Sequence, residues 1–281
     1  AFSFQAPTTK LNAMRIVRAL QVRKPILIEG NPGVGKTTLV TALANAVGKP
    51  LIRINLSEQT DLMDLFGSDV PVEGAEAGNF AWRDAPFLQA MQNGGWVLLD
   101  EMNLASQSVL EGLNACLDHR GTVYISELDQ VFTRHPDFCV FAAQNPHHQG
   151  GGRKGLPSSF VNRFTVVYAD VFRTDDLTLI CNHSFPDVSD DTLSKIIAFV
   201  SVLEREVIHR RKFGSLGGPW EFNLRDSLRW LQLLSSSKPL LAASRPSDFL
   251  DILFLQRFRT AKDREEVEKI FTQVFEMDVP F

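Results

Sequence analysis

The chain has 281 residues, a formal net charge of −4 and 44% hydrophobic residues. These values suit one large or two small globular domains and give no electrostatic case for direct nucleic-acid binding, although a local basic patch stays open. We find no apolar run long enough to span a bilayer and no signal peptide at the start, so no membrane partner is predicted. Three widely separated cysteines without metal-ligand spacing suit reduced thiols in an intracellular compartment.

The most informative stretch reads G-N-P-G-V-G-K-T over residues 30–37. This is the spacing of a phosphate-binding loop (Walker A), and a predicted strand over 26–29 and a predicted helix over 38–47 supply the required context. The glycines let backbone N–H groups turn toward phosphate oxygens, and the helix dipole points its positive end at them. A glycine turn with an accidental lysine is the alternative.

Within this loop, Lys36 would place its ammonium near the β- and γ-phosphates of a nucleotide, and the Thr37 hydroxyl would bind a magnesium ion. The predicted nucleotide-binding residues are Gly30, Asn31, Pro32, Gly33, Val34, Gly35, Lys36, Thr37 and Thr38.

Alternation and helical spacing predict further elements in the first half of the chain. They are a helix over 10–22, a strand over 51–55, a helix over 57–66, a loop or small insertion over about 67–80, a strand over 80–84 and a helix over 86–92. We interpret the aromatic residues in the last two elements as packing residues rather than as a ligand site.

A second motif lies at residues 96–101, where four apolar residues precede Asp100 and Glu101. The apolar run predicts a strand buried in a parallel sheet, and open α/β sheets place their ligands at the carboxyl ends of such strands. Asp100 would hold magnesium through water, and Glu101 would polarise the attacking water as general base. This Walker B pattern gains its meaning from the phosphate-binding loop that precedes it.

A helix over 106–118 and a β-hairpin over about 121–133 lead to another predicted buried strand at 138–143. That strand runs into Asn145, which would lie beside Glu101 at the carboxyl edge and orient the attacking water. His147 and His148 follow, but no acid or cysteine stands at ligand spacing, so a basic glycine-rich loop is preferred over a metal site.

After a strand at 165–168 the pattern becomes helical. The sequence therefore predicts an α/β domain over 1–172 and a small all-helical domain over 173–281. The predicted helices of the second domain are 174–182, 191–211, 224–234, 246–257 and 262–275, with a flexible break over 214–219.

The chain resembles an AAA+ ATPase module. The resemblance rests on both nucleotide motifs, Asn145, the Asn-Arg-Phe at 162–164 and the Asn-Leu-Arg-Asp at 223–226. The hairpin and the insertion before Walker B look like the dynein-related, MoxR-like branch. The resemblance implies a P-loop NTPase fold, a parallel sheet flanked by helices and followed by a helical lid. It also implies hydrolysis of ATP to ADP with Mg²⁺.

The same resemblance assigns roles to three polar residues. Asn145 matches the sensor-1 position, Arg163 matches the arginine finger that acts on a neighbouring module, and Arg225 matches sensor 2. An arginine at such a site contributes on the order of 10³–10⁵ in rate in phosphoryl transfer. Without the resemblance, a surface salt bridge is the preferred interpretation of Arg163, and Arg225 would serve either its own site or a neighbour's.

A narrower set of segments, at 6–9, 53–61, 144–146 and 150–157, is similar to a giant nuclear member of this branch with six modules in one chain. This similarity implies neighbouring modules in a hexameric ring, and pre-60S ribosomal particles with their assembly factors, as partners. The implied work is release of those factors, and the implied location is the nucleus (nucleolus and nucleoplasm).

Two alternatives stay open: a structural module that holds ATP or ADP with little turnover, and a self-assembling MoxR-like chaperone ATPase. A helicase or clamp loader is disfavoured, because the chain is acidic and lacks a basic, aromatic-rich stripe.

Overall fold

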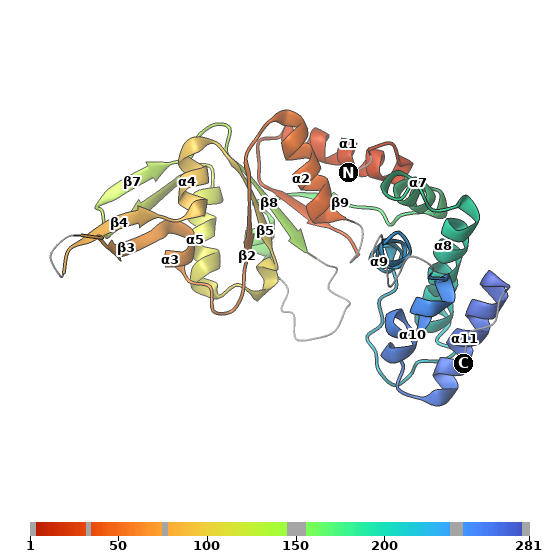
Figure 1. The fold of residues 1–281 in the computed structure, drawn as a ribbon. Coiled ribbons are helices and arrows are strands. Elements are labelled where there is room, and N and C mark those ends of the chain that lie inside the picture. Colours follow the sequence, from red (N-terminus) through yellow and green to blue (C-terminus); the bar gives the residue numbers. More distant parts are fainter. Residues whose placement is uncertain (1–3, 32–34, 75–77, 145–155, 237–243, 277–281) are drawn as a thin grey trace. The chain divides into compact units, whose positions relative to one another are not determined.

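The computed structural model describes residues 4–31, 35–74, 78–144, 156–236 and 244–276. Contacts divide them into an α/β unit, made of residues 11–31 and 35–171, and a helical unit, made of the described residues in 1–10 and 172–281 (Figure 1). The sequence placed all of residues 1–172 in the first domain, whereas the structure groups residues 4–10 with the helices. Each unit is described by itself.

The α/β unit is built on a five-stranded parallel sheet with the strand order β2-β5-β8-β1-β9. The strands are β1 (Ile26–Glu29), β2 (Leu51–Asn55), β5 (Trp96–Asp100), β8 (Cys139–Gln144) and β9 (Thr165–Tyr168). The central strands are apolar almost throughout, as expected for strands covered on both faces. The predicted fold class is confirmed.

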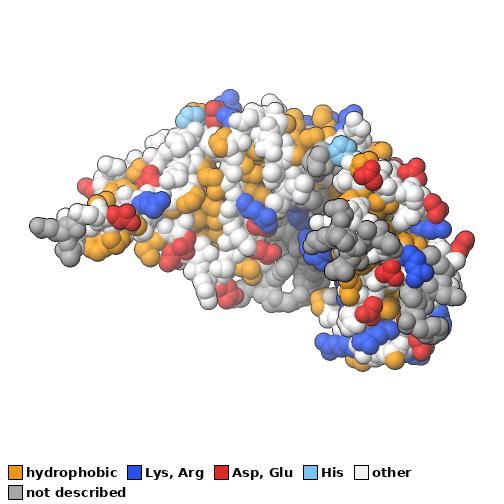
Figure 2. Space-filling view, in the orientation of Figure 1, with side chains coloured by type: hydrophobic (Ala, Val, Ile, Leu, Met, Phe, Trp, Pro, Cys, Tyr) orange, Lys and Arg blue, Asp and Glu red, His pale blue; other side chains and the backbone are white. Residues whose placement is uncertain are grey.

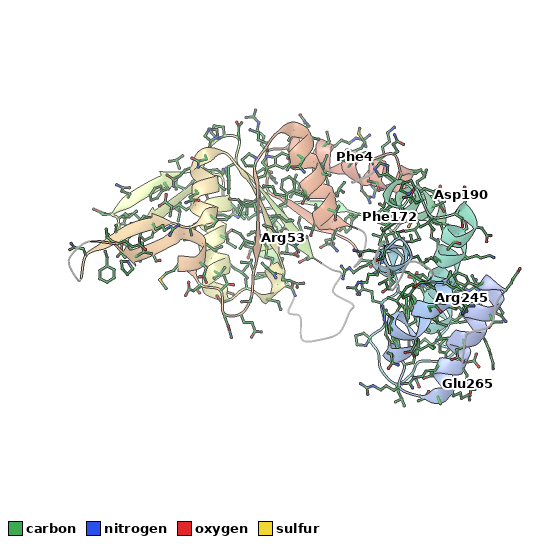
Figure 3. The ribbon with its side chains drawn as sticks, in the orientation of Figure 1. Phe4, Arg53, Phe172, Asp190, Arg245 and Glu265 are labelled. Carbon is green, nitrogen blue, oxygen red and sulfur yellow. The ribbon has the colours of Figure 1, made fainter. Side chains whose placement is uncertain are left out.

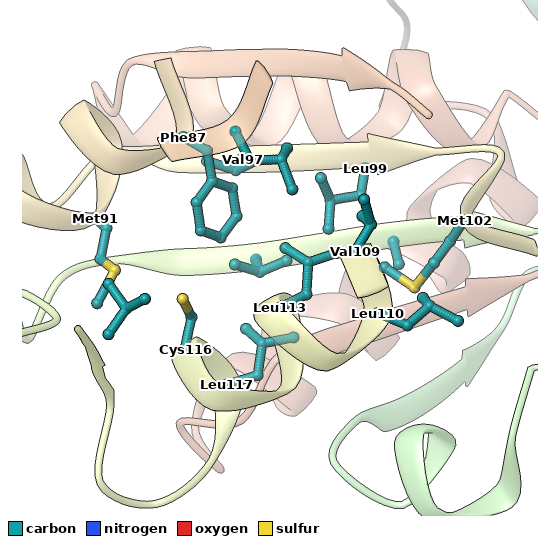
Figure 4. Packing of buried hydrophobic residues seen from close by; sticks show 14 of the residues in the cluster. Phe87, Met91, Val97, Leu99, Met102, Val109, Leu110, Leu113, Cys116 and Leu117 are labelled. Atoms are coloured by element: carbon teal, nitrogen blue, oxygen red, sulfur yellow. The ribbon is translucent and has the colours of Figure 1, made fainter. Parts of the chain in front are cut away.

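Successive side chains of a strand point to opposite faces of the sheet, so the apolar strands present two apolar faces. Helices cover both of them. On one face, Val97 and Leu99 of β5 join a core with α4 (Pro86–Asn93) and α5 (Gln107–Leu117), shown in Figure 4. Helix α2 (Lys36–Val47) packs against β5 and β8, and its buried residues lie outside that core. Helix α2 therefore covers the opposite face.

Two antiparallel hairpins extend the unit: β3 (Gly67–Pro71) with β4 (Phe80–Asp84), and β6 (Thr122–Ile125) with β7 (Gln130–Thr133). The loop predicted from residue 67 onward is wrong for its first five residues, which form β3. Gly67 makes this pairing possible, because a Cβ there would lie 2.3 Å from the Arg83 carbonyl oxygen and its φ is +135°.

Between β2 and β3, the predicted helix over 57–66 is also shorter than expected. Helix α3 spans only Leu62–Phe66, because Asp61 caps it by accepting from the Met63 and Asp64 N–H groups. The preceding residues form a turn in which the Ser57 N–H donates to Thr60 Oγ1.

The helical unit contains α7 (Thr174–Ser184), α8 (Asp190–Glu204), α9 (Leu224–Leu234), α10 (Leu250–Leu253) and α11 (Ala261–Phe275), and among the described residues no strand follows β9. Its core is aromatic, with Phe199 packed edge-on against Trp230, Phe254 and Phe271. Aromatic pairs of this geometry add roughly 0.5–1.5 kcal/mol each beyond their buried area.

Two helices of this unit depart from the prediction. Residues 246–257 form 3₁₀ turns on either side of the short α10, because Phe254 leaves helical geometry and buries its ring beside Trp230. Helix α8 ends at Glu204 and continues as a π-helical turn over Arg205–His209. Glu206 in that turn is 8% exposed and accepts from Lys212 and Arg210.

A buried carboxylate ties the start of the chain to the helical unit. Asp176 in the first turn of α7 is fully buried and accepts hydrogen bonds from the Thr8 N–H (2.7 Å), the Thr8 hydroxyl (2.5 Å) and the Arg173 N–H (2.8 Å). A helix N-terminus favours a negative group at this place. Residue 8 thus gains a partner 168 positions away.

We expect Asp176→Ala to lower the free energy of unfolding by roughly 2–4 kcal/mol, because two buried donors of Thr8 and the part-buried Arg173 N–H lose their acceptor. Urea denaturation followed by circular dichroism measures this change. Asp175→Ala is the matched control, since Asp175 is exposed in the same turn. Equal effects of the two substitutions would contradict the role of the buried carboxylate.

Burial raises the pKa of Cys116, Cys139 and Cys181 from 9.0 to about 12, so we expect these thiols to stay protonated in the fold near neutral pH. At pH 8 we expect an aromatic disulfide reagent to label them only after denaturation. Rapid labelling of a thiol in the folded protein would show that the region around it opens.

The unfolded chain loses the thiol protons at lower pH than the folded chain, so the free energy of unfolding should fall as the pH rises from about 9 toward 12.

Candidate functional site

The three strands that carry the sequence motifs end at the same edge of the sheet. Residue pairs across the sheet are Glu29 with Gln144 and Asp100 with Ala143, so β1, β5 and β8 finish side by side. The chain leaves β1 toward β2 on one side, and β9 pairs on the other side of β1. Open α/β sheets bind ligands beside the carboxyl end of a strand where the connections diverge in this way.

The phosphate-binding loop leaves β1 at this edge and leads into α2. Gly35 has a left-handed backbone (φ 73°), and α2 begins at the next residue. Lys36 Nζ donates to the carbonyl oxygens of Gly30 (2.5 Å) and Asn31 (3.5 Å). The middle of the predicted loop, Pro32, Gly33 and Val34, lies outside the described residues.

Asp100 lies on the face of the sheet that α2 covers. The strand alternates, so Asp100 shares its face with Leu98, whereas Val97 and Leu99 point to the core on the other face. Thr37 lies in the first turn of α2 and is half-buried. The Asp100 carboxylate and the Thr37 hydroxyl, which we predict to bind magnesium, thus lie on the same side of the sheet.

The donor set suits magnesium in a nucleotide site. Within the described ranges, no group of three or more His, Cys, Asp or Glu side chains gathers around a possible metal position. Magnesium with a nucleotide takes one or two protein oxygens and several phosphate and water oxygens, rather than an all-protein cage. A hydroxyl at Thr37 and a carboxylate at Asp100 fit that pattern.

Glu101 has an unusual backbone at the end of β5. Its φ and ψ are 56° and 40°, in the left-handed region that a residue with a Cβ seldom adopts. Its N–H donates to Asp100 Oδ1 at 3.2 Å, and its side chain is half-buried. Backbone outliers of this kind cluster at active sites and ligand-binding sites.

The predicted sensor Asn145 lies outside the described residues, as do His147, His148 and the glycine-rich loop after them. Strand β8 is described up to Gln144, which is 6% exposed and donates from Nε2 to Glu29 Oε1 at 2.9 Å. This hydrogen bond links the ends of β8 and β1. The water-orienting role of Asn145 stays a prediction.

Arg163 follows the short helix α6 (Ser158–Val161) and is half-buried. Its Nε donates to Asn114 Oδ1 on α5 at 3.1 Å. No ion pair joins Arg163 to an acid of the described chain, so the salt-bridge alternative gains no support from these residues. Its action on a neighbouring module stays a prediction.

Arg225 belongs to the helical unit, in the first turn of α9, with an exposed side chain. Its N–H donates to the capping residue Asn223 at 2.9 Å. Asp226, the next residue, is buried and binds Arg257, whose guanidinium lies 5.6 Å from the centre of the Phe222 ring. This network holds the start of α9, and the nucleotide-sensing role of Arg225 stays a prediction.

Sequence reasoning missed two contacts of the site residues. Arg53 of β2 binds Asp100, and Asn114 binds Arg163, over separations of 47 and 49 residues. Arg53 had a local signal, since it is a lone charge in an alternating strand. Asn114 had none, because an amide on a helix suits an exposed face equally well.

The distribution of charge and the length of apolar helices are two further features of the described chain. Acidic and basic side chains are interspersed on the face of the molecule shown in Figure 2. In the part of the chain that the structure describes, no helix is both long and apolar enough to cross a membrane.

Comparisons with known proteins identify the family of this chain. The family profile of the AAA domain (dynein-related subfamily) matches residues 25–164, and that of the midasin AAA lid domain matches residues 176–278. Midasin of Dictyostelium discoideum is 56% identical over 274 residues, which are 98% of this chain and 5% of that protein. Midasin of Giardia intestinalis is 45% identical over 282 residues, 99% of this chain and 6% of that protein.

The chain therefore spans 5–6% of the length of these two relatives. An uncharacterised protein of Staphylococcus saprophyticus is 30% identical over 182 residues, 64% of this chain and 68% of that protein. The crystal structure of a putative ATPase from Cytophaga hutchinsonii covers 98% of this chain and 97% of its own, with 16% identity and a TM-score of 0.46.

Proposed function

This chain belongs to the dynein-related AAA family and carries a midasin-type AAA lid, and from this premise we propose that it is an ATP-hydrolysing module of a ring-shaped remodelling machine. The observation that supports the proposal best is the shared carboxyl edge. There the phosphate-binding loop follows β1, Asp100 ends the nearby β5 on the side of α2, and Glu101 directly follows it.

Each residue has a distinct part in the proposed reaction. The loop N–H groups and Lys36 bind the phosphates of ATP, and Thr37 and Asp100 hold magnesium. Magnesium, when bound, offsets the negative charge of the β- and γ-phosphates. Glu101, which directly follows β5, takes a proton from the attacking water.

Three further residues complete the proposed machinery. Asn145 orients the attacking water, Arg163 supplies positive charge to the nucleotide of a neighbouring module, and Arg225 senses nucleotide in its own site or a neighbour's. Supporting the second role, Asn114 engages only Nε of Arg163, so the two terminal nitrogens of the fork have no described partner.

The proposed partners follow from the relatives. The chain spans a small part of two midasins, so we place it as one module among neighbours in a hexameric ring of the same chain. The proposed work of that ring is release of assembly factors from pre-60S ribosomal particles in the nucleus. Neither a membrane nor direct nucleic-acid binding is part of the proposal.

We expect Glu101→Gln to lower ATP turnover by about 10²–10⁴-fold, the usual contribution of a general base, while nucleotide binding is kept. Turnover is measured with the neighbouring modules present, and the affinity for a fluorescent ATP analogue is measured on the same preparation. Lys36→Ala is the opposite control, because it should weaken binding itself. Unchanged turnover in Glu101→Gln would exclude Glu101 as the base.

Turnover per molecule should stay flat and low as the concentration of the wild-type chain is raised, because the arginine that acts on this chain's own nucleotide must come from a different module. A steep rise, abolished by Arg163→Ala, would instead indicate that identical copies complete each other's sites, as in a self-assembling MoxR-like ATPase. If adding the neighbouring modules restores no turnover, the chain is a nucleotide-holding structural module.

A further inference from the structure

Arg53 reaches the Walker B carboxylate from the next strand. Strands β2 and β5 pair in parallel, with Arg53 opposite Leu98 and Asn55 opposite Asp100. Arg53 and Asp100 are therefore diagonal neighbours on the face that α2 covers, within reach of a long side chain. Figure 3 shows Arg53 extending from the sheet.

The contact between these side chains is short and direct. Arg53 Nη2 lies 2.6 Å from Asp100 Oδ2, in the range of a charge-assisted hydrogen bond. The other oxygen of the carboxylate, Oδ1, accepts the Glu101 N–H at 3.2 Å. Both oxygens of Asp100 are thus engaged by the chain's own donors.

The Arg53 guanidinium, a permanent positive charge, contacts the same Asp100 carboxylate that is suited to magnesium. A guanidinium stays protonated throughout the working pH range, and it repels a dication that approaches the same carboxylate. The Arg53 side chain is 56% exposed and that of Asp100 is 20% exposed. An ion pair this open to water is weak enough to exchange.

We propose that Arg53 competes with magnesium for Asp100, and thereby raises the magnesium concentration at which the site retains nucleotide. The proposal rests on the proposed function, in which Asp100 serves the metal. Arg53 is a positioning residue in this scheme: it acts on Asp100, which it releases when the dication binds. An ordinary ion pair at the edge of the sheet would support β2 and leave magnesium dependence unchanged.

The test is the free Mg²⁺ concentration that gives half-maximal binding of a fluorescent ADP analogue, at constant ionic strength. We expect Arg53→Gln to lower this concentration by roughly two- to fivefold, the factor that corresponds to an exposed ion pair. Arg83→Gln is the matched control, because Arg83 is an exposed strand arginine on β4 and its loss changes net charge equally. It should leave the magnesium dependence as in the wild type.

A double-mutant cycle separates this inference from the proposed function. In the Asp100→Asn background, Arg53→Gln should have no further effect, because the shared carboxylate is gone. If the free Mg²⁺ concentration at half-maximal binding is unchanged or higher in Arg53→Gln, Arg53 does not compete with magnesium for Asp100. If Asp100→Asn alone leaves the magnesium dependence unchanged, Asp100 does not serve the metal, and the proposed function fails at that residue. Circular dichroism of each variant checks that the fold is intact.

Discussion

Parallel register in the five-stranded sheet is the constraint on which the site depends. Strand β5 lies between β2 and β8, and each pairing aligns the carboxyl ends. Register decides the face of every side chain, since a slip of one residue would turn Asp100 into the core and Leu99 toward α2. The cluster of apolar residues around Val97 and Leu99 makes such a slip costly. Core packing therefore holds the position of the acids.

The two units gain their stability by different means. The α/β unit relies on apolar strands sandwiched between helices, where alternation carries the pattern. The helical unit relies on large rings, with Phe199 and Trp230 at its centre. A ring must fit its neighbours in one orientation, so the backbone leaves helical geometry at Phe254, where α10 ends. Buried Asp176 then binds the segment around Thr8 to the same unit.

Polar contacts at the site hold the reactive groups in place more than they add stability. The Glu101 backbone is kept in a left-handed conformation with its N–H on Asp100, and Arg163 is held at Nε by Asn114. Such restraints lower the freedom of a side chain before substrate arrives. Arg53 differs, because its side chain is 56% exposed where it pairs with Asp100. The site thus combines groups with one orientation and a carboxylate with two partners.

The sequence by itself determined the fold class, the phosphate-binding loop and the Asp100–Glu101 pair. These features are local: a strand, a glycine-rich turn and a helix start are encoded in contiguous residues, and strand alternation reveals burial. Only the tertiary structure decided that residues 67–71 form a strand, that residues 246–257 break into turns, and that Arg53 binds Asp100. In each case the partner lies elsewhere in the chain, so the local pattern does not identify it. Pairing across a sheet and packing of rings arise only when distant segments meet.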